Sequence, residues 1–154
     1  MSFIKILRRV QFLANFKKLK NKHHVFRYCK PSLCSRERQV IFEEAFELRE
    51  SKNEEYLSCH WVEFYPNKPE KSKRELRVSP KKNGFIAKLN VGKIIEYGRM
   101  YALNGIYVTR KDSNSSYSGI FNTSNENRDF LKALSEDATS EYKKYLSQDQ
   151  DINS

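Results

Sequence analysis

The chain has 154 residues and a net charge of +10, with 38% of its residues hydrophobic and 13% aromatic. This length predicts one domain with a core, which ten Phe and nine Tyr can supply where aliphatic residues are few. The sequence contains no run of about 18 apolar residues, which excludes a membrane-spanning helix.

The positive charge is concentrated at the N-terminal end. Residues 1–36 contain ten Lys or Arg and no acid, whereas the other 118 residues carry nineteen basic and nineteen acidic groups. Such a block attracts phosphates, anionic lipids or an acidic protein partner. Residues 37–63 carry eight acids against three basic residues, so the chain has poles of opposite sign. This favours oriented association with a partner or with itself.

Residues 3–20 are predicted to form an amphipathic helix. Either this helix packs on its own domain, or it is a basic surface helix that docks on a protein, a nucleic acid or a membrane. We expect residues 1–22 to form this helical segment, residues 23–147 a single α+β domain, and residues 148–154 a disordered tail. The apolar face comprises Phe3, Ile6, Leu7, Val10, Leu13 and Ala14, and the basic residues Lys5, Arg8 and Arg9 lie opposite.

Alternating residues then predict strands. Residues 39–50 alternate apolar with charged positions, which predicts one strand. The apolar run 55–65 fits either a strand or a short buried helix. A strand is also predicted in residues 23–30, where His24, Phe26 and Tyr28 alternate with Val25 and Arg27 before Pro31.

The second half of the chain predicts a loop, strands and a helix. Residues 66–83 hold seven basic residues, two acids and three prolines, which predicts a mobile basic loop. Residues 84–98 and 100–110 are predicted as successive strands, and 112–119 as a polar loop. Residues 124–146 are predicted as a helix, with Ser124 or Asn125 as its cap. Its apolar face comprises Phe130, Leu131, Leu134, Ala138, Tyr142, Tyr145 and Leu146. This order predicts an α+β fold with a mainly antiparallel sheet.

Few residue types offer chemistry. His24 or His60 with Glu63 could serve as an acid–base pair, because imidazole titrates near neutral pH and a carboxylate can orient it. A structural role is the alternative for each. Cys29 and Cys34 have no second pair to complete a zinc site, and the common phosphate-binding and nucleophile motifs are absent. We therefore expect no metal, no cofactor, and free thiols in a cytoplasmic setting.

Two further features concern residues 45–65. Trp61, the single tryptophan, lies in an apolar run beside Phe64 and Tyr65, where it either packs in the core or stacks on a base. The segment AFELRESKNEEYLSCHWVEF, residues 45–64, resembles a pattern in small, uncharacterised bacterial proteins. The resemblance implies a bacterial origin and no particular function.

On charge distribution, we favour a small basic protein that binds nucleic acid, or an accessory subunit of a nucleic-acid-associated complex. The alternatives are a small enzyme, a nuclease or nucleotide transferase using His24, His60 and Glu63, and a protein-interaction subunit that docks through its N-terminal helix. An acidic protein partner and self-association stay open, and we do not favour a membrane surface. The candidate nucleic-acid-binding residues are Lys5, Arg8, Arg9, Lys17, Lys18, Lys20, Lys22, Arg27, Lys71, Lys73, Arg74, Lys81 and Lys82.

Overall fold

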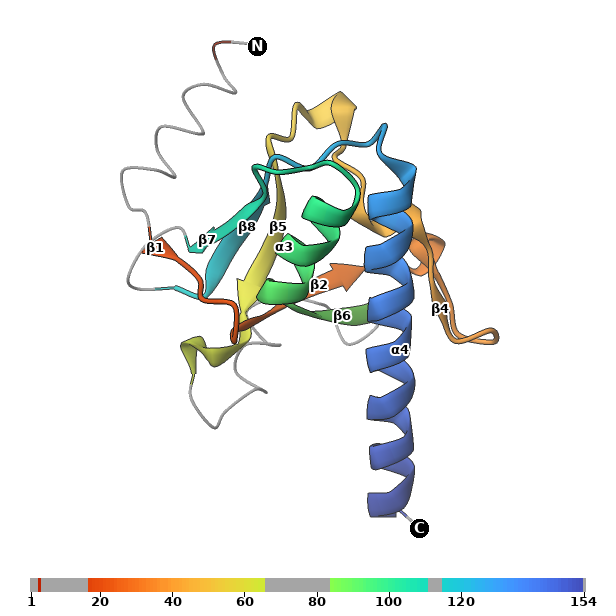
Figure 1. Ribbon diagram of the computed structural model, residues 1–154. Coiled ribbons are helices and arrows are strands. Elements are labelled where there is room, and N and C mark those ends of the chain that lie inside the picture. Colours follow the sequence, from red (N-terminus) through yellow and green to blue (C-terminus); the bar gives the residue numbers. More distant parts are fainter. Residues whose placement is uncertain (1–2, 4–16, 66–83, 111–114, 154) are drawn as a thin grey trace.

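A computed structural model of the chain describes residue 3 and residues 17–65, 84–110 and 115–153, with side chains described as far as residue 140. The fold is α+β with a mainly antiparallel sheet, as the sequence predicts. Six strands form this sheet in the order β1-β7-β8-β5-β2-β6 (Figure 1). In that order they are Lys17–Lys18, Tyr107–Arg110, Tyr117–Phe121, Tyr56–Trp61, His24–Cys29 and Phe85–Asn90.

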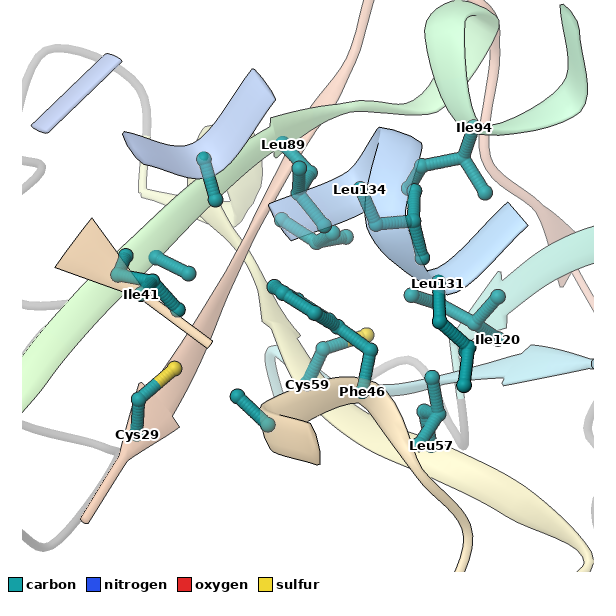
Figure 2. Packing of buried hydrophobic residues seen from close by; sticks show 14 of the residues in the cluster. Cys29, Ile41, Phe46, Leu57, Cys59, Leu89, Ile94, Ile120, Leu131 and Leu134 are labelled. Atoms are coloured by element: carbon teal, nitrogen blue, oxygen red, sulfur yellow. The ribbon is translucent and has the colours of Figure 1, made fainter. Parts of the chain in front are cut away.

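Two helices, α3 (Val91–Met100) and α4 (Arg128–Asn153), cover one face of the sheet (Figure 1). Many of the apolar strand residues that point to this face are fully buried, among them Val25, Leu57 and Leu89. Figure 2 shows Leu131 of α4 beside Ile120 and Leu57 of the sheet. Each such side chain stabilises the fold by about 1.5–3 kcal/mol relative to an exposed one. No helix in the described part of the chain is long and apolar enough to cross a membrane.

The apolar face predicted for the C-terminal helix is confirmed where side chains are described. Phe130, Leu131, Leu134 and Ala138 are all 0% exposed. Two hydrogen bonds also fasten this helix to β4 (Val40–Ile41). The Ser135 hydroxyl donates to the Ile41 carbonyl at 2.6 Å, and the Thr139 hydroxyl oxygen accepts from the Ile41 N–H at 3.0 Å.

The ends of this helix differ from the prediction. Its cap is Asn127, whose side-chain oxygen accepts from the Phe130 N–H at 3.2 Å, instead of Ser124 or Asn125. The Asn125 side chain binds the backbone of Leu48 instead. Its oxygen accepts from the Leu48 N–H and its nitrogen donates to the Leu48 carbonyl, each at 2.7 Å. The helix also continues to Asn153, so residues 148–153, predicted as a disordered tail, are helical.

The strand predicted for residues 39–50 is wrong beyond Ile41. Only β4 forms, pairing with β3 (Cys34–Ser35), and a 3-10 helix, η2 (Glu43–Phe46), follows it. The alternation of apolar and charged residues wrongly predicted a longer strand, because the segment leaves the plane of the sheet. Its residues Ala45 and Phe46 are buried and cover the core. Its glutamates meet Arg128 at the start of α4: Glu43 at 3.2 Å, Glu47 at 2.9 Å and Glu44 at 4.0 Å. A second 3-10 helix, η3, spans Glu50–Lys52.

The strands predicted for residues 84–98 and 100–110 are correct only at 85–90 and 107–110, because α3 lies between β6 and β7. Asn90 starts the helix: its side-chain oxygen accepts from the Lys93 N–H at 3.0 Å, while its amide donates to the carbonyls of Asn21 and His23. An Asn with such partners ends a strand and caps a helix. The polar loop predicted for 112–119 is also wrong from residue 117, where β8 begins.

The remaining predictions fall partly outside the described residues. Residues 4–16 of the predicted helix 3–20, and the predicted basic loop 66–83, lie there. The end of that predicted helix is wrong: Lys17–Lys18 form β1, and the Leu19 N–H donates to the Val108 carbonyl at 2.9 Å. Residues 55–65 resolve as β5 followed by a single 3-10 turn, η4 (Val62–Phe64). The predicted strand at residues 23–30 is confirmed as β2.

Candidate functional site

The face of the sheet opposite the helices carries most of the polar and aromatic strand residues. Side chains alternate along a strand, so His24 and Phe26 of β2 point away from the core face that Val25 faces. The register places Phe26 opposite His60 of β5, and His60 opposite Tyr117 of β8. We call this surface the aromatic face and define it by Lys18, His24, Phe26, Tyr56, His60, Lys88, Tyr107, Tyr117 and Phe121.

Two of the candidate catalytic residues, His24 and Glu63, form an ion pair with each other. Oε1 of Glu63 lies 2.5 Å from Nδ1 of His24, and Oε2 accepts from the His24 backbone N–H at 2.9 Å. The turn η4 makes this possible, because it carries Glu63 back from the end of β5 towards β2. Both side chains are about one-third exposed, at 35% and 33%. A carboxylate held in this way fixes the orientation of the imidazole.

His60 has a different partner. Its Nδ1 shares a 2.9 Å hydrogen bond with the hydroxyl of Ser116, which is fully buried. His60 and Glu63 are therefore not brought together as a pair. His24 and His60 nevertheless occupy diagonal positions on the adjacent strands β2 and β5, since His60 lies opposite Phe26. Diagonal neighbours in an antiparallel sheet are about 7–8 Å apart.

Aromatic rings continue from His60 across the aromatic face. The His60 and Tyr117 rings meet edge to face, with centroids 5.6 Å apart, and the hydroxyls of Tyr117 and Tyr56 are 3.1 Å apart. Burial, with this hydrogen bond second, raises the pKa of Tyr117. Gly119 makes room for the ring of Tyr56, because a Cβ at residue 119 would lie 2.7 Å from it. The arrangement is a set of half-buried rings held in fixed orientations.

The aromatic face ends at a basic edge. Tyr107 of β7 stacks on Phe121 of β8 with ring centroids 5.0 Å apart and an interplanar angle of 3°. The Lys18 ammonium of β1 lies 5.5 Å from the centre of the Tyr107 ring, a cation–π contact. At this side of the sheet an exposed cation, Lys18, therefore lies beside the half-buried ring of Tyr107, whereas the ring of Phe121 is buried.

Trp61 is set apart from the aromatic face. It is half-buried and packs against the core cluster, on the same side of the sheet as Val25, its register partner. The Arg110 guanidinium lies 5.5 Å from the centre of its ring, and the His23 ring is 5.0 Å away. Of the two roles considered for Trp61, packing against the core is the one that the structure describes.

The cysteines are buried free thiols. Burial raises the pKa of Cys29 and of Cys59 to about 12, and it also raises the pKa of Cys34. Such thiols are protonated at neutral pH and make poor nucleophiles. Within the described ranges, no group of three or more His, Cys, Asp or Glu side chains could hold a metal ion.

The predicted nucleic-acid-binding residues divide into three groups. Lys18, Lys20 and Lys22 are exposed. Arg27 points to the core side of β2, where its guanidinium donates to the carbonyls of Ala45 and Ser58. Outside the described residues, or with side chains outside them, lie Lys5, Arg8, Arg9, Lys17, Lys71, Lys73, Arg74, Lys81 and Lys82.

Sequence reasoning missed the contribution of β8 to this site. Ser116, Tyr117 and Phe121 were assigned to, or next to, a polar loop because serine and glycine are frequent there. The available signal was the alternation of Tyr117, Gly119 and Phe121 with Ser118 and Ile120, which is a strand pattern.

Comparison of the chain with protein-family models, with curated protein sequences and with solved structures found no match. We therefore infer the function of the chain from the chemistry and geometry of the described residues.

Proposed function

We propose that the chain binds single-stranded nucleic acid across the aromatic face. The observation that carries this proposal is the stack of Tyr107 on Phe121 with the Lys18 ammonium 5.5 Å from the Tyr107 ring. Proteins that bind single strands combine aromatic rings, on which bases stack, with cations that follow the phosphates. Tyr117 extends the same surface along β8, and Tyr56 and His60 extend it onto one further strand, β5.

The charge distribution supports the same surface. Lys18 belongs to the acid-free segment 1–36, which holds the whole net charge, and Lys88 lies on the aromatic face at β6. Glu63, a carboxylate beside this face, is paired with His24. Glu43 and Glu44 of η2, and Glu47 just after it, lie instead around Arg128 at the start of α4, on the helix side of the sheet. A polyanion would therefore be attracted to one side of the molecule and repelled from the other.

The test is fluorescence anisotropy with a labelled single-stranded oligonucleotide at about 50 and 200 mM salt. Tyr107→Ala should weaken binding by roughly 1–3 kcal/mol, the value of one stacked base. Lys18→Gln should reduce the salt slope by about 0.7, the share of one phosphate contact on a single strand. Lys132→Gln is the matched control, because Lys132 is exposed on the helix side at α4.

Two results would count against the proposal. One is binding that is absent or insensitive to salt. The other is an equal effect of Lys18→Gln and Lys132→Gln, since unselective attraction by net charge produces that pattern.

A second candidate function is acid–base catalysis on a phosphodiester, and the 2.5 Å contact of His24 with Glu63 is the observation that favours it. In the described residues, Nε2 of His24 makes no hydrogen bond, so it could exchange a proton with a substrate. His60 on the adjacent strand could provide the second proton-transfer group. A nuclease would need both groups, one as base and one as acid.

RNA and DNA cleavage by His24→Ala, His60→Ala and Glu63→Gln tests this candidate. Loss of a general acid or base should lower the rate by roughly 10²–10⁴-fold while oligonucleotide binding persists. Wild-type protein that binds the oligonucleotide and leaves it intact would reject the nuclease and keep the binding function.

A further inference from the structure

A pocket of about 470 Å³ lies on the core side of β2, away from the aromatic face. Its walls come from β2, from η2 and from the segment that leads to η3, and they include Arg27, Lys30, Leu33, Leu48 and Glu50. This volume lies in the range of small-molecule sites, and the two leucines provide apolar walls beside charged groups.

Arg27 brings to this pocket a positive charge that has no ion-pair partner among the described residues. Its Nε donates to the Ala45 carbonyl at 2.9 Å and its Nη1 to the Ser58 carbonyl at 2.7 Å. Both acceptors are neutral, and no carboxylate of the described residues forms an ion pair with Arg27. Its Nη2 makes no hydrogen bond within the same residues, which leaves two N–H donors unused.

A largely buried guanidinium without a direct ion-pair partner is costly, and Glu54 only partly offsets this cost through its charge. Burial accordingly lowers the pKa of Arg27, although the group stays charged at neutral pH. An anion entering from the pocket would supply both a direct ion-pair partner and an acceptor for Nη2. Hydrogen bonds between two ionised groups are about twice as strong as neutral ones.

The other charged side chains narrow the choice of anion. Arg49 is paired with Glu54, and Glu47 with Arg128. Lys30 and Glu50 are exposed and form no ion pair with a described residue. The pocket thus offers cations at Arg27 and Lys30 and an uncommitted carboxylate at Glu50. Because Glu44 and Glu47 also line it, a multiply charged phosphate would be repelled.

We propose that this pocket binds a small zwitterion, an amino acid or short peptide, with its carboxylate at Arg27 and Lys30 and its ammonium group at Glu50. Leu33 and Leu48 contact the apolar part of the ligand. This site is independent of the nucleic-acid-binding proposal, because Arg27 and His24 point to opposite faces of β2.

The experiment titrates the full-length ¹⁵N-labelled protein with the dipeptide alanyl-alanine to about 20 mM, above the millimolar Kd expected of so small a ligand. Saturable shifts are expected for the Arg27 Hε and for backbone amides of residues 47–51. Alanyl-alanine amide, which lacks the carboxylate, should produce none of them, and inorganic phosphate should bind more weakly than the dipeptide.

Substitutions at Lys30, Glu50 and Arg27 test which residues bind the carboxylate and which bind the ammonium group of the ligand. Lys30→Gln removes an exposed cation and should raise the Kd by about tenfold, whereas Lys132→Gln should leave it unchanged. Glu50→Gln should weaken alanyl-alanine and leave acetate unaffected. Arg27→Lys keeps the charge but loses the planar fork, and should abolish the shifts. Arg27 also donates to the Ala45 carbonyl. If Arg27→Lys therefore unfolds the protein, the Kd of Lys30→Gln and the comparison of the dipeptide with its amide test the proposal.

Absence of saturable shifts at these positions would overturn the proposal. So would equal binding of the dipeptide and its amide, or an unchanged Kd in Lys30→Gln. An unchanged Kd for the dipeptide in Glu50→Gln would overturn the zwitterionic ligand.

Discussion

Glu63 contacts His24 with both carboxylate oxygens, one at 2.5 Å from the ring Nδ1 and the other at 2.9 Å from the backbone N–H. The two residues are 39 positions apart, and the contact joins the end of β5 to the start of β2. It therefore holds the register of two central strands as well as the orientation of an imidazole on the aromatic face.

Glu63→Gln should lower the free energy of unfolding by about 0.5–1 kcal/mol. The amide keeps one acceptor and loses the charge. Partial exposure of both side chains reduces the free energy that the ion pair contributes. Urea denaturation measures this change. Glu96→Gln, at an exposed position of α3, is the matched control and should stay within about 0.5 kcal/mol of wild type. Equal effects of the two substitutions would show that the His24 contact adds no stability.

Leu134→Ala should destabilise the fold by roughly 2–5 kcal/mol, because Leu134 is 0% exposed at the contact of α4 with the sheet. Lys132→Ala, two residues earlier and exposed, should change stability by less than about 0.5 kcal/mol. Thermal and urea unfolding of the two variants provide the comparison. A loss below about 1 kcal/mol for Leu134→Ala would contradict the packing described for α4.

Gly119→Ala should cost about 1–3 kcal/mol and should also weaken oligonucleotide binding, because the new Cβ would lie 2.7 Å from the Tyr56 ring and displace it. Gly105→Ala serves as the control, since its nearest contact would be the side-chain nitrogen of Asn122 at 3.3 Å. Unfolding and anisotropy are measured on both variants. Normal oligonucleotide binding by a folded Gly119→Ala protein would remove Tyr56 from the proposed interface.

The unfolding free energy should fall as the pH rises above 9. The pKa of Cys29 and of Cys59 is about 12 in the fold against an ordinary value of 9.0, so between these values the folded state holds protons that the unfolded chain releases. The stabilisation is complete below pH 9 and is lost towards pH 12, at up to about 1.4 kcal/mol per pH unit for each thiol. Urea denaturation at pH 8 to 10.5 measures the slope.

Cys29→Ala combined with Cys59→Ala should flatten that slope, because the two buried thiols produce it. A slope that persists unchanged in this double variant would assign the effect to other groups.

Features with a local cause could be predicted from the sequence alone. The strand His24–Cys29 follows from the alternation of its side chains, and the buried face of α4 follows from apolar residues three and four positions apart. The α+β class follows from the order of such segments. Periodicity is a property of neighbouring residues, so a single chain displays it.

Tertiary structure decided the rest. Residues 91–100 carry β-branched residues that fit a strand. They form a helix because Asn90 caps it while bonding to Asn21 and His23. Arg27 belongs to the basic N-terminal block, yet its position on β2 points it to carbonyls of the core side. Glu63 pairs with His24 and not with His60, and this choice depends on the strand register and on one turn at Val62–Phe64. These partners lie far apart in the chain, and only the folded backbone sets the distance between them.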